Sequence, residues 1–133
     1  MDKARLKAIP LFANLDDHDL GVIATFANET SVSEGDTLVR EGDFSYELMA
    51  IEEGTADVRR GQQTIAQLGP GDFFGEIGVL RNDLRTATVV ATSAMRLVTL
   101  THWELKRMRN MPGVMEKIEE AINARRAPSG GAA

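Results

Sequence analysis

Cysteine is missing from all 133 residues of this chain. A disulfide framework, a thiolate nucleophile and a cysteine-based zinc site are therefore excluded. Histidine is scarce as well, because His18 and His102 are the two that occur and neither has further ligands at metal-binding spacing. No Ser-His-Asp arrangement is evident either. The sequence consequently predicts a protein that is not an enzyme and holds no metal.

Long apolar runs and an excess of basic residues are also missing. Residues 1–7 lead into no stretch that resembles a signal peptide, and no stretch approaches the length of a membrane span. These absences predict a cytoplasmic location. The net charge is −5 and the pI is about 5.0, so direct DNA binding, which needs a concentrated basic surface, is not expected. One well-placed arginine is nevertheless enough to bind a small anion.

The length and composition fit one folded unit. Hydrophobic residues make up 43% of the chain and charged residues 26%, which is typical of a soluble globular domain rather than a disordered chain. The last seven residues are small and turn-forming, and are predicted to be disordered. The predicted boundaries are a domain over residues 1–126 and a tail over residues 127–133.

Helical patterns flank the chain at both ends. Asp16 and Asp17 are suited to cap and charge a helix start. Thr101 is a candidate cap for a helix after the last strand, and Pro112 marks a break and a new helix start. Apolar residues recur at one-face helical spacing in both flanks, which indicates helices that pack on a partner surface: Leu20 and Ile23 in the first, Val114, Ile118 and Ala121 in the last.

Between residues 29 and 100 the pattern changes to short β-prone runs separated by glycine turns. Many short strands with glycine-rich corners favour a barrel or jelly roll over a parallel α/β sheet. The predicted fold class is mainly β with flanking helices: a double-stranded β-helix (jelly-roll) barrel with an N-terminal helix and two C-terminal helices. The strand candidates are residues 48–51, 56–58, 64–68 and 88–91.

The stretch 71–91 carries the chemistry. It reads Gly-Asp-Phe-Phe-Gly-Glu-Ile-Gly-Val-Leu over 71–80 and Arg-Thr-Ala-Thr-Val-Val-Ala over 85–91. Glu76 can accept hydrogen bonds from a sugar hydroxyl, and Arg85, nine residues later, offers the rigid fork that matches phosphate oxygens. Gly75 and Gly78 let a ligand approach the backbone, and a helix start here favours an anion. The combination suits a nucleotide with one compact phosphate.

This stretch resembles the phosphate-binding cassette of the cyclic nucleotide-binding domain family, of the catabolite activator and protein kinase A regulatory subunit type. The likeness extends to the turn at 41–43, the hairpin at 51–58 and the run 68–76, and covers roughly residues 5 to 125 as a stand-alone domain. It implies that Glu76 binds the ribose 2′-hydroxyl and that Arg85 pairs with the cyclic phosphate. The final helix would close over the base. The implied ligand-binding residues are Phe74, Gly75, Glu76, Ile77, Gly78, Arg85, Thr86 and Ala87, with Ile122, Arg125 and Arg126 as base-capping candidates.

The resemblance implies a sensor that couples ligand binding to movement of its C-terminal helices and acts on a protein effector the sequence does not identify. The ligand is expected to be cAMP, with cGMP as the alternative because Thr86 places a hydroxyl beside the phosphate. Two further functions stay open: an interaction module of the same fold that binds no ligand, and a regulatory fragment of a larger enzyme, channel or transcription regulator. The 33 residues after Leu100 suffice for two helices but not for a helix-turn-helix as well. A cupin-type metalloenzyme shares the outline of the fold but needs the histidine cluster that is missing.

Overall fold

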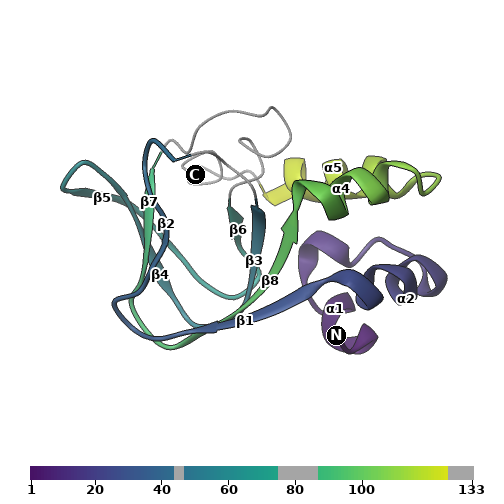
Figure 1. Cartoon of the computed structure of the whole chain (residues 1–133), viewed down its shortest axis with the longest axis horizontal. Coiled ribbons are helices and arrows are strands. Elements are labelled where there is room, and N and C mark those ends of the chain that lie inside the picture. The colour runs from purple at the N-terminus through teal and green to yellow at the C-terminus, as the bar shows by residue number, and fades with distance from the viewer. Residues whose placement is uncertain (44–46, 75–86, 126–133) are drawn as a thin grey trace.

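The chain folds into two antiparallel β-sheets with helices gathered at one side, as a computed structural model shows (Figure 1). The structure describes residues 1–43, 47–74 and 87–125. The helical segments are α1 (Lys3–Lys7), the 3₁₀ turn η1 (Pro10–Phe12), α2 (Asp17–Phe26), α4 (His102–Arg109) and α5 (Val114–Arg125). The strands are β1 (Asn28–Val32), β2 (Thr37–Val39), β3 (Glu47–Glu53), β4 (Ala56–Arg60), β5 (Gln63–Leu68), β6 (Phe73–Phe74), β7 (Thr88–Ala91) and β8 (Met95–Thr101).

Each sheet has four strands in the described part of the chain. The first sheet has the order β1-β8-β3-β6 and the second the order β2-β7-β4-β5. Strands far apart in the chain are neighbours, since β1 pairs with β8 and β2 with β7. This order confirms the predicted mainly β class with flanking helices, and all four predicted strand segments lie in strands.

The central strands of the first sheet, β3 and β8, are buried on both faces. Successive residues of a strand point to opposite faces, and in β3 Leu48 and Ala50 join one apolar cluster while Met49 and Ile51 join another. One cluster, here called the helical core, unites this sheet with α1, η1, α2, α4 and α5. The other, here called the inter-sheet core, unites both sheets.

The N-terminal region holds more helix than predicted. The predicted helix is α2, and Asp16 caps it by accepting a hydrogen bond from the Asp19 amide at 2.8 Å. A second helix, α1, precedes it, and Asp2 caps α1 by accepting from the amides of Ala4 (2.7 Å) and Arg5 (3.3 Å). Five residues are too few to show a helical period, so the sequence pattern did not indicate α1.

The C-terminal helices follow the predicted plan, with two differences. The last helix begins at Val114 rather than at Pro112, because Gly113 adopts φ 75° between them. Thr101 occupies the cap position of α4, but its hydroxyl donates to the Glu104 carboxylate instead of accepting from the backbone. The predicted apolar stripe Val114, Ile118 and Ala121 is buried in the helical core.

Candidate functional site

The two ends of the predicted cassette lie in different sheets. The chain leaves the first sheet at Phe74, which pairs with Met49 of β3. It enters the second sheet at Thr88, where β7 lies between β2 and β4. Phe74 (2% exposed) and Ala87 (0%) both pack in the inter-sheet core. Both ends of the cassette are therefore anchored in the same apolar core.

Most of the predicted ligand-binding residues are not described by the structure. Phe74 and Ala87 are described. Ile122 and Arg125 lie in the last helix, α5. The roles of Glu76 at the ribose and of Arg85 at the cyclic phosphate therefore stay predictions. The residues outside the described ranges are Gly75, Glu76, Ile77, Gly78, Arg85, Thr86 and Arg126.

Two polar contacts hold the strand that follows the cassette. The Glu41 amide donates to Thr88 Oγ1 at 3.0 Å, and Glu41 Oε1 accepts from the Gly61 amide at 3.1 Å. Glu41 thus links the turn after β2 to β7 through its backbone amide and to the β4–β5 hairpin through its side chain. The sequence marks Glu41 only as part of a turn, because contacts over 47 and 20 positions leave no local pattern.

The two phenylalanines before the cassette face opposite cores. Phe73 packs in the helical core, with Leu105 and Met108 of α4 among its members. Phe74 packs in the inter-sheet core. Successive residues of a strand point to opposite faces of the sheet. The start of the cassette is therefore in contact with both cores.

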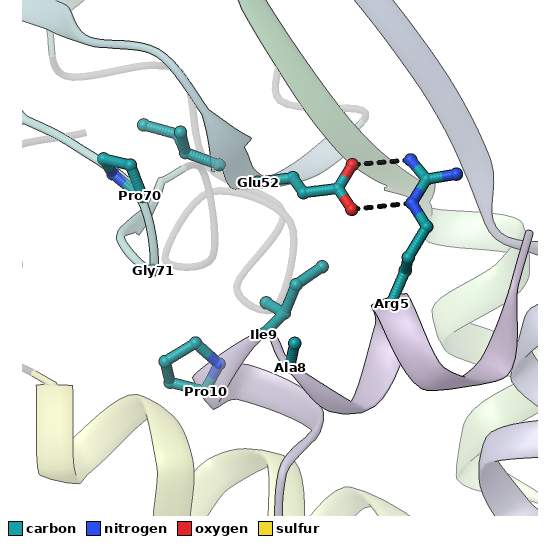
Figure 2. A pocket seen from close by; sticks show the side chains of 8 residues that line it. Arg5, Ala8, Ile9, Pro10, Glu52, Pro70 and Gly71 are labelled. Carbon is teal, nitrogen blue, oxygen red and sulfur yellow. Dashed lines mark hydrogen bonds and ion pairs between the residues drawn. The ribbon is translucent and has the colours of Figure 1, made fainter.

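A cavity of about 240 Å³ lies between the N-terminal helical segment and the first sheet (Figure 2). Its charged wall is Arg5, whose Nε donates to Glu52 Oε2 at 2.8 Å and whose Nη2 donates to Glu52 Oε1 at 2.6 Å. Arg5 Nη2 also lies 2.6 Å from Glu29 Oε1. Apolar and turn residues form the rest of the lining: Ala8, Ile9, Pro10, Ile51, Pro70 and Gly71.

This ion-paired group fastens α1 to the sheet beside the turn that leads into β6. The hydrogen bonds from Arg5 hold the pKa of the Glu52 carboxyl below its ordinary value, and the same bonds raise the pKa of Arg5. This group leaves no local signal in the sequence, since 47 positions separate its two main members. Pro70 and Gly71 place the cavity beside the turn that leads into β6.

The described residues also bear on a metal site and on a membrane span. Histidine, aspartate and glutamate side chains within the described ranges form no group of three able to hold a metal ion. His18 lies in α2 and His102 begins α4. In the same ranges, every helix is too short or too polar to cross a membrane.

Comparison with known proteins gives consistent results. Residues 29–110 match the sequence model of a family described as "Cyclic nucleotide-binding domain". The chain is 35% identical over 96 residues to a cAMP-dependent protein kinase regulatory subunit of Eremothecium gossypii, covering 71% of this chain and 21% of that protein. It is 37% identical over 95 residues to a cGMP-dependent protein kinase of Drosophila melanogaster, covering 67% of this chain and 10% of that one. This chain therefore spans about a fifth or less of the length of these curated relatives.

A solved structure extends the likeness to the fold. The N-terminal domain of a transcriptional regulator from Streptomyces coelicolor superimposes with a TM-score of 0.77 at 30% identity, covering 91% of each chain. The family model matches only residues 29–110, whereas the superposition covers 91% of this chain. The structural match therefore includes the helical flanks as well as the sheets.

Proposed function

This chain belongs to the cyclic nucleotide-binding domain family, and we propose that it is a sensor whose ligand is cAMP. Glu76 would bind the ribose 2′-hydroxyl and Arg85 the cyclic phosphate, helped by backbone groups at Gly75, Thr86 and Ala87. The family match carries the proposal, because residues 29–110 include both Glu76 and Arg85. The family is a regulatory and binding one, so the proposed role includes no catalysis by this chain.

The preference for cAMP rests on the relatives, several of which are named cAMP-dependent protein kinase regulatory subunits. The fungal relative is named for cAMP and the insect relative for cGMP, at similar identities of 35% and 37%. Thr86 suits either ligand. We therefore propose cAMP as the ligand and cGMP as the competitor that the experiment must include. A cytoplasmic location and a protein effector are part of the same proposal.

Coupling to the C-terminal helices is supported by the packing around Phe73. This residue stands directly before the cassette and shares the helical core with Leu105 and Met108 of α4 and Ile118 of α5. A ligand shifts such an equilibrium only by its differential affinity for the two arrangements. Ligand that draws the cassette inward would shift Phe73 and thereby the helices packed on it.

Calorimetric titration of cAMP and cGMP into the wild type and Arg85→Ala tests the ligand. Removing one partner of a buried charged hydrogen-bond pair should cost about 2–5 kcal/mol of binding free energy. Arg96→Ala is the matched control, since Arg96 lies on β8 and forms an exposed ion pair at 3.6 Å with Glu53. We expect it to bind as the wild type does.

Each result has a clear meaning. A wild type that binds neither nucleotide contradicts the sensor and favours an interaction module of the same fold. Equal affinity of Arg85→Ala and the wild type contradicts the role of Arg85 while leaving the family intact. Tighter binding of cGMP than of cAMP overturns the ligand preference alone.

A further inference from the structure

Helices α4 and α5 form an antiparallel pair at one side of the molecule (Figure 1). Their inner sides are apolar, because Leu105 and Met108 of α4 and Val114 and Ile118 of α5 are buried in the helical core. Their opposite sides face solvent. These two solvent faces carry charges of opposite sign.

The solvent face of α4 is basic and aromatic. Trp103, Lys106 and Arg107 lie three and four positions apart, which places them on one helical face, and all are exposed, Trp103 by 63%. Lys106 Nζ lies 5.9 Å from the Trp103 ring centre, and the Arg107 guanidinium lies 4.7 Å from that of Phe26. Such contacts limit the freedom of both cations.

The acidic residue of α4 does not offset this charge at the surface. Glu104 is half-buried and accepts hydrogen bonds from Thr101 Oγ1 and, at 3.0 Å, from Asn28 Nδ2. Arg109 adds a third exposed cation. With three basic residues and one acidic residue, α4 carries +2, so the remaining residues of this −5 chain carry −7. The basic face is therefore a local feature of an acidic molecule.

The cations of α4 form no ion pair with any carboxylate in the described ranges, whereas Lys3, Arg5, Arg59 and Arg96 all do. This difference arises although acidic residues outnumber basic ones by 20 to 15. The basic face is thus open to a charged partner.

The solvent face of α5 is acidic. Glu116, Glu119 and Glu120 repeat the spacing of three and four positions, and all are exposed. None of them forms an ion pair with a described cation. Adjacent helices of one chain therefore present complementary faces that do not pair with each other.

We propose that this helix pair is a self-complementary dimerisation surface, in which the basic face of α4 docks on the acidic face of α5 of a second copy. A two-fold axis makes each contact occur twice, as an isologous interface requires. Trp103 is suited to anchor the contact, because tryptophan and arginine dominate interface energetics. A polyanion such as nucleic acid would also meet the carboxylates of α5, which repel it.

Sedimentation velocity at two salt concentrations tests the dimer without any nucleotide present. We expect a dimer at about 50 mM salt and dissociation at about 1 M, where the Debye length falls to about 3 Å. The proposal is overturned if the wild type stays monomeric at low salt at protein concentrations up to about 1 mM. A dissociation constant above that concentration would be too weak for a specific dimer. The result is independent of the ligand proposal, since neither Glu76 nor Arg85 takes part.

Charge exchange tests the specific pairing. Lys106→Glu/Arg107→Glu and Glu119→Lys/Glu120→Lys each place like charges in both contacts, so each should weaken the dimer by at least about 100-fold. An equimolar mixture of the two variants restores both contacts and should sediment as a dimer. Lys3→Glu/Lys7→Glu is the control, because it changes the net charge by the same amount on α1 and should dimerise like the wild type.

Circular dichroism confirms that each variant is folded before it is mixed. A dimer that persists in either charge-reversed variant overturns the proposed pairing. Failure of the mixture of two folded variants to dimerise overturns it as well.

Discussion

At the scale of single residues, Gly54 is placed where a side chain has no room. Its φ is 94°, a conformation that residues with a side chain rarely adopt. A Cβ built there would lie 2.4 Å from the Ala94 carbonyl oxygen and 2.7 Å from Met95 Cγ. The backbone and the neighbouring strand therefore both require glycine between β3 and β4.

An alanine at a positive φ costs on the order of 1–3 kcal/mol for the backbone conformation alone. Gly54→Ala should lower the free energy of unfolding by more than this amount, because its Cβ also meets Ala94 and Met95. Gly35→Ala is the matched control, because Gly35 has φ 91° and nothing within 4 Å of a built Cβ. Urea unfolding of both variants isolates the cost of the contacts. Equal losses in the two variants would show that the Ala94 and Met95 contacts relax without cost.

The Arg5–Glu52 pair makes a pH-dependent contribution at the same scale. Arg5 lowers the pKa of Glu52 from its ordinary value of 4.5, so the pair stabilises the fold above that pH. The stabilisation is lost as the pH falls through the lower pKa of the folded state. Arg5 keeps its proton throughout this range, because its pKa is raised.

Glu52→Gln should therefore destabilise the protein at pH 7 and flatten the decline of stability below pH 4.5. We expect a loss of about 1 kcal/mol or less at pH 7, since Arg5 is 35% exposed and solvent screens the pair. Glu34→Gln, at an exposed turn position, serves as the control. Urea unfolding measured from pH 3 to pH 7 would contradict the prediction if the two variants had the same pH profile.

At the scale of elements, β6 joins the cassette to the helices. Phe73 packs in the helical core with Leu105 and Met108 of α4, and the chain's single tryptophan, Trp103, lies on the solvent face of the same helix. Trp103 fluorescence therefore reports on α4 without any added label. If the proposed coupling holds, saturating cAMP should change this emission.

Phe73→Leu should retain cAMP binding but reduce the change in Trp103 emission, because the smaller side chain transmits less of the displacement to α4. Val58→Ala is the control, since Val58 lies in the inter-sheet core and its truncation should lower stability without altering the emission change. The measurement is a fluorescence titration with binding checked by calorimetry. An unchanged emission in the wild type at saturation contradicts coupling to α4.

Some elements were predictable from the sequence and others were not. The segments 48–51 and 88–91 stand out because they are apolar and bounded by turns, and α5 because its apolar stripe is periodic. Strand β1 shows no such pattern, since four of its five residues are exposed. Strand β8 shows none because it is buried on both faces: Met95 and Leu97 face the inter-sheet core, Val98 and Leu100 the helical core.

At the scale of the whole molecule, the family and the fold class followed from motifs that are local in sequence. The cassette motif and its glycine turns need only neighbouring residues to be seen. Contacts such as Arg5–Glu52 and Glu41–Thr88 each span 47 positions, and they depend on how the sheets and helices come together. The sequence thus indicates the chemistry of the site better than the contacts that support it.

The first sheet lies between the helical core and the inter-sheet core, which constrains how the protein can evolve. A substitution in β3 or β8 that changes side-chain volume on one face shifts the backbone that the other face uses. Residues between the sheets and residues under the helices are therefore not free to vary separately. A substitution at a position such as Ile51 should therefore be accompanied by compensating substitutions at positions such as Ile118. These two residues belong to different cores, and the first sheet is what connects those cores.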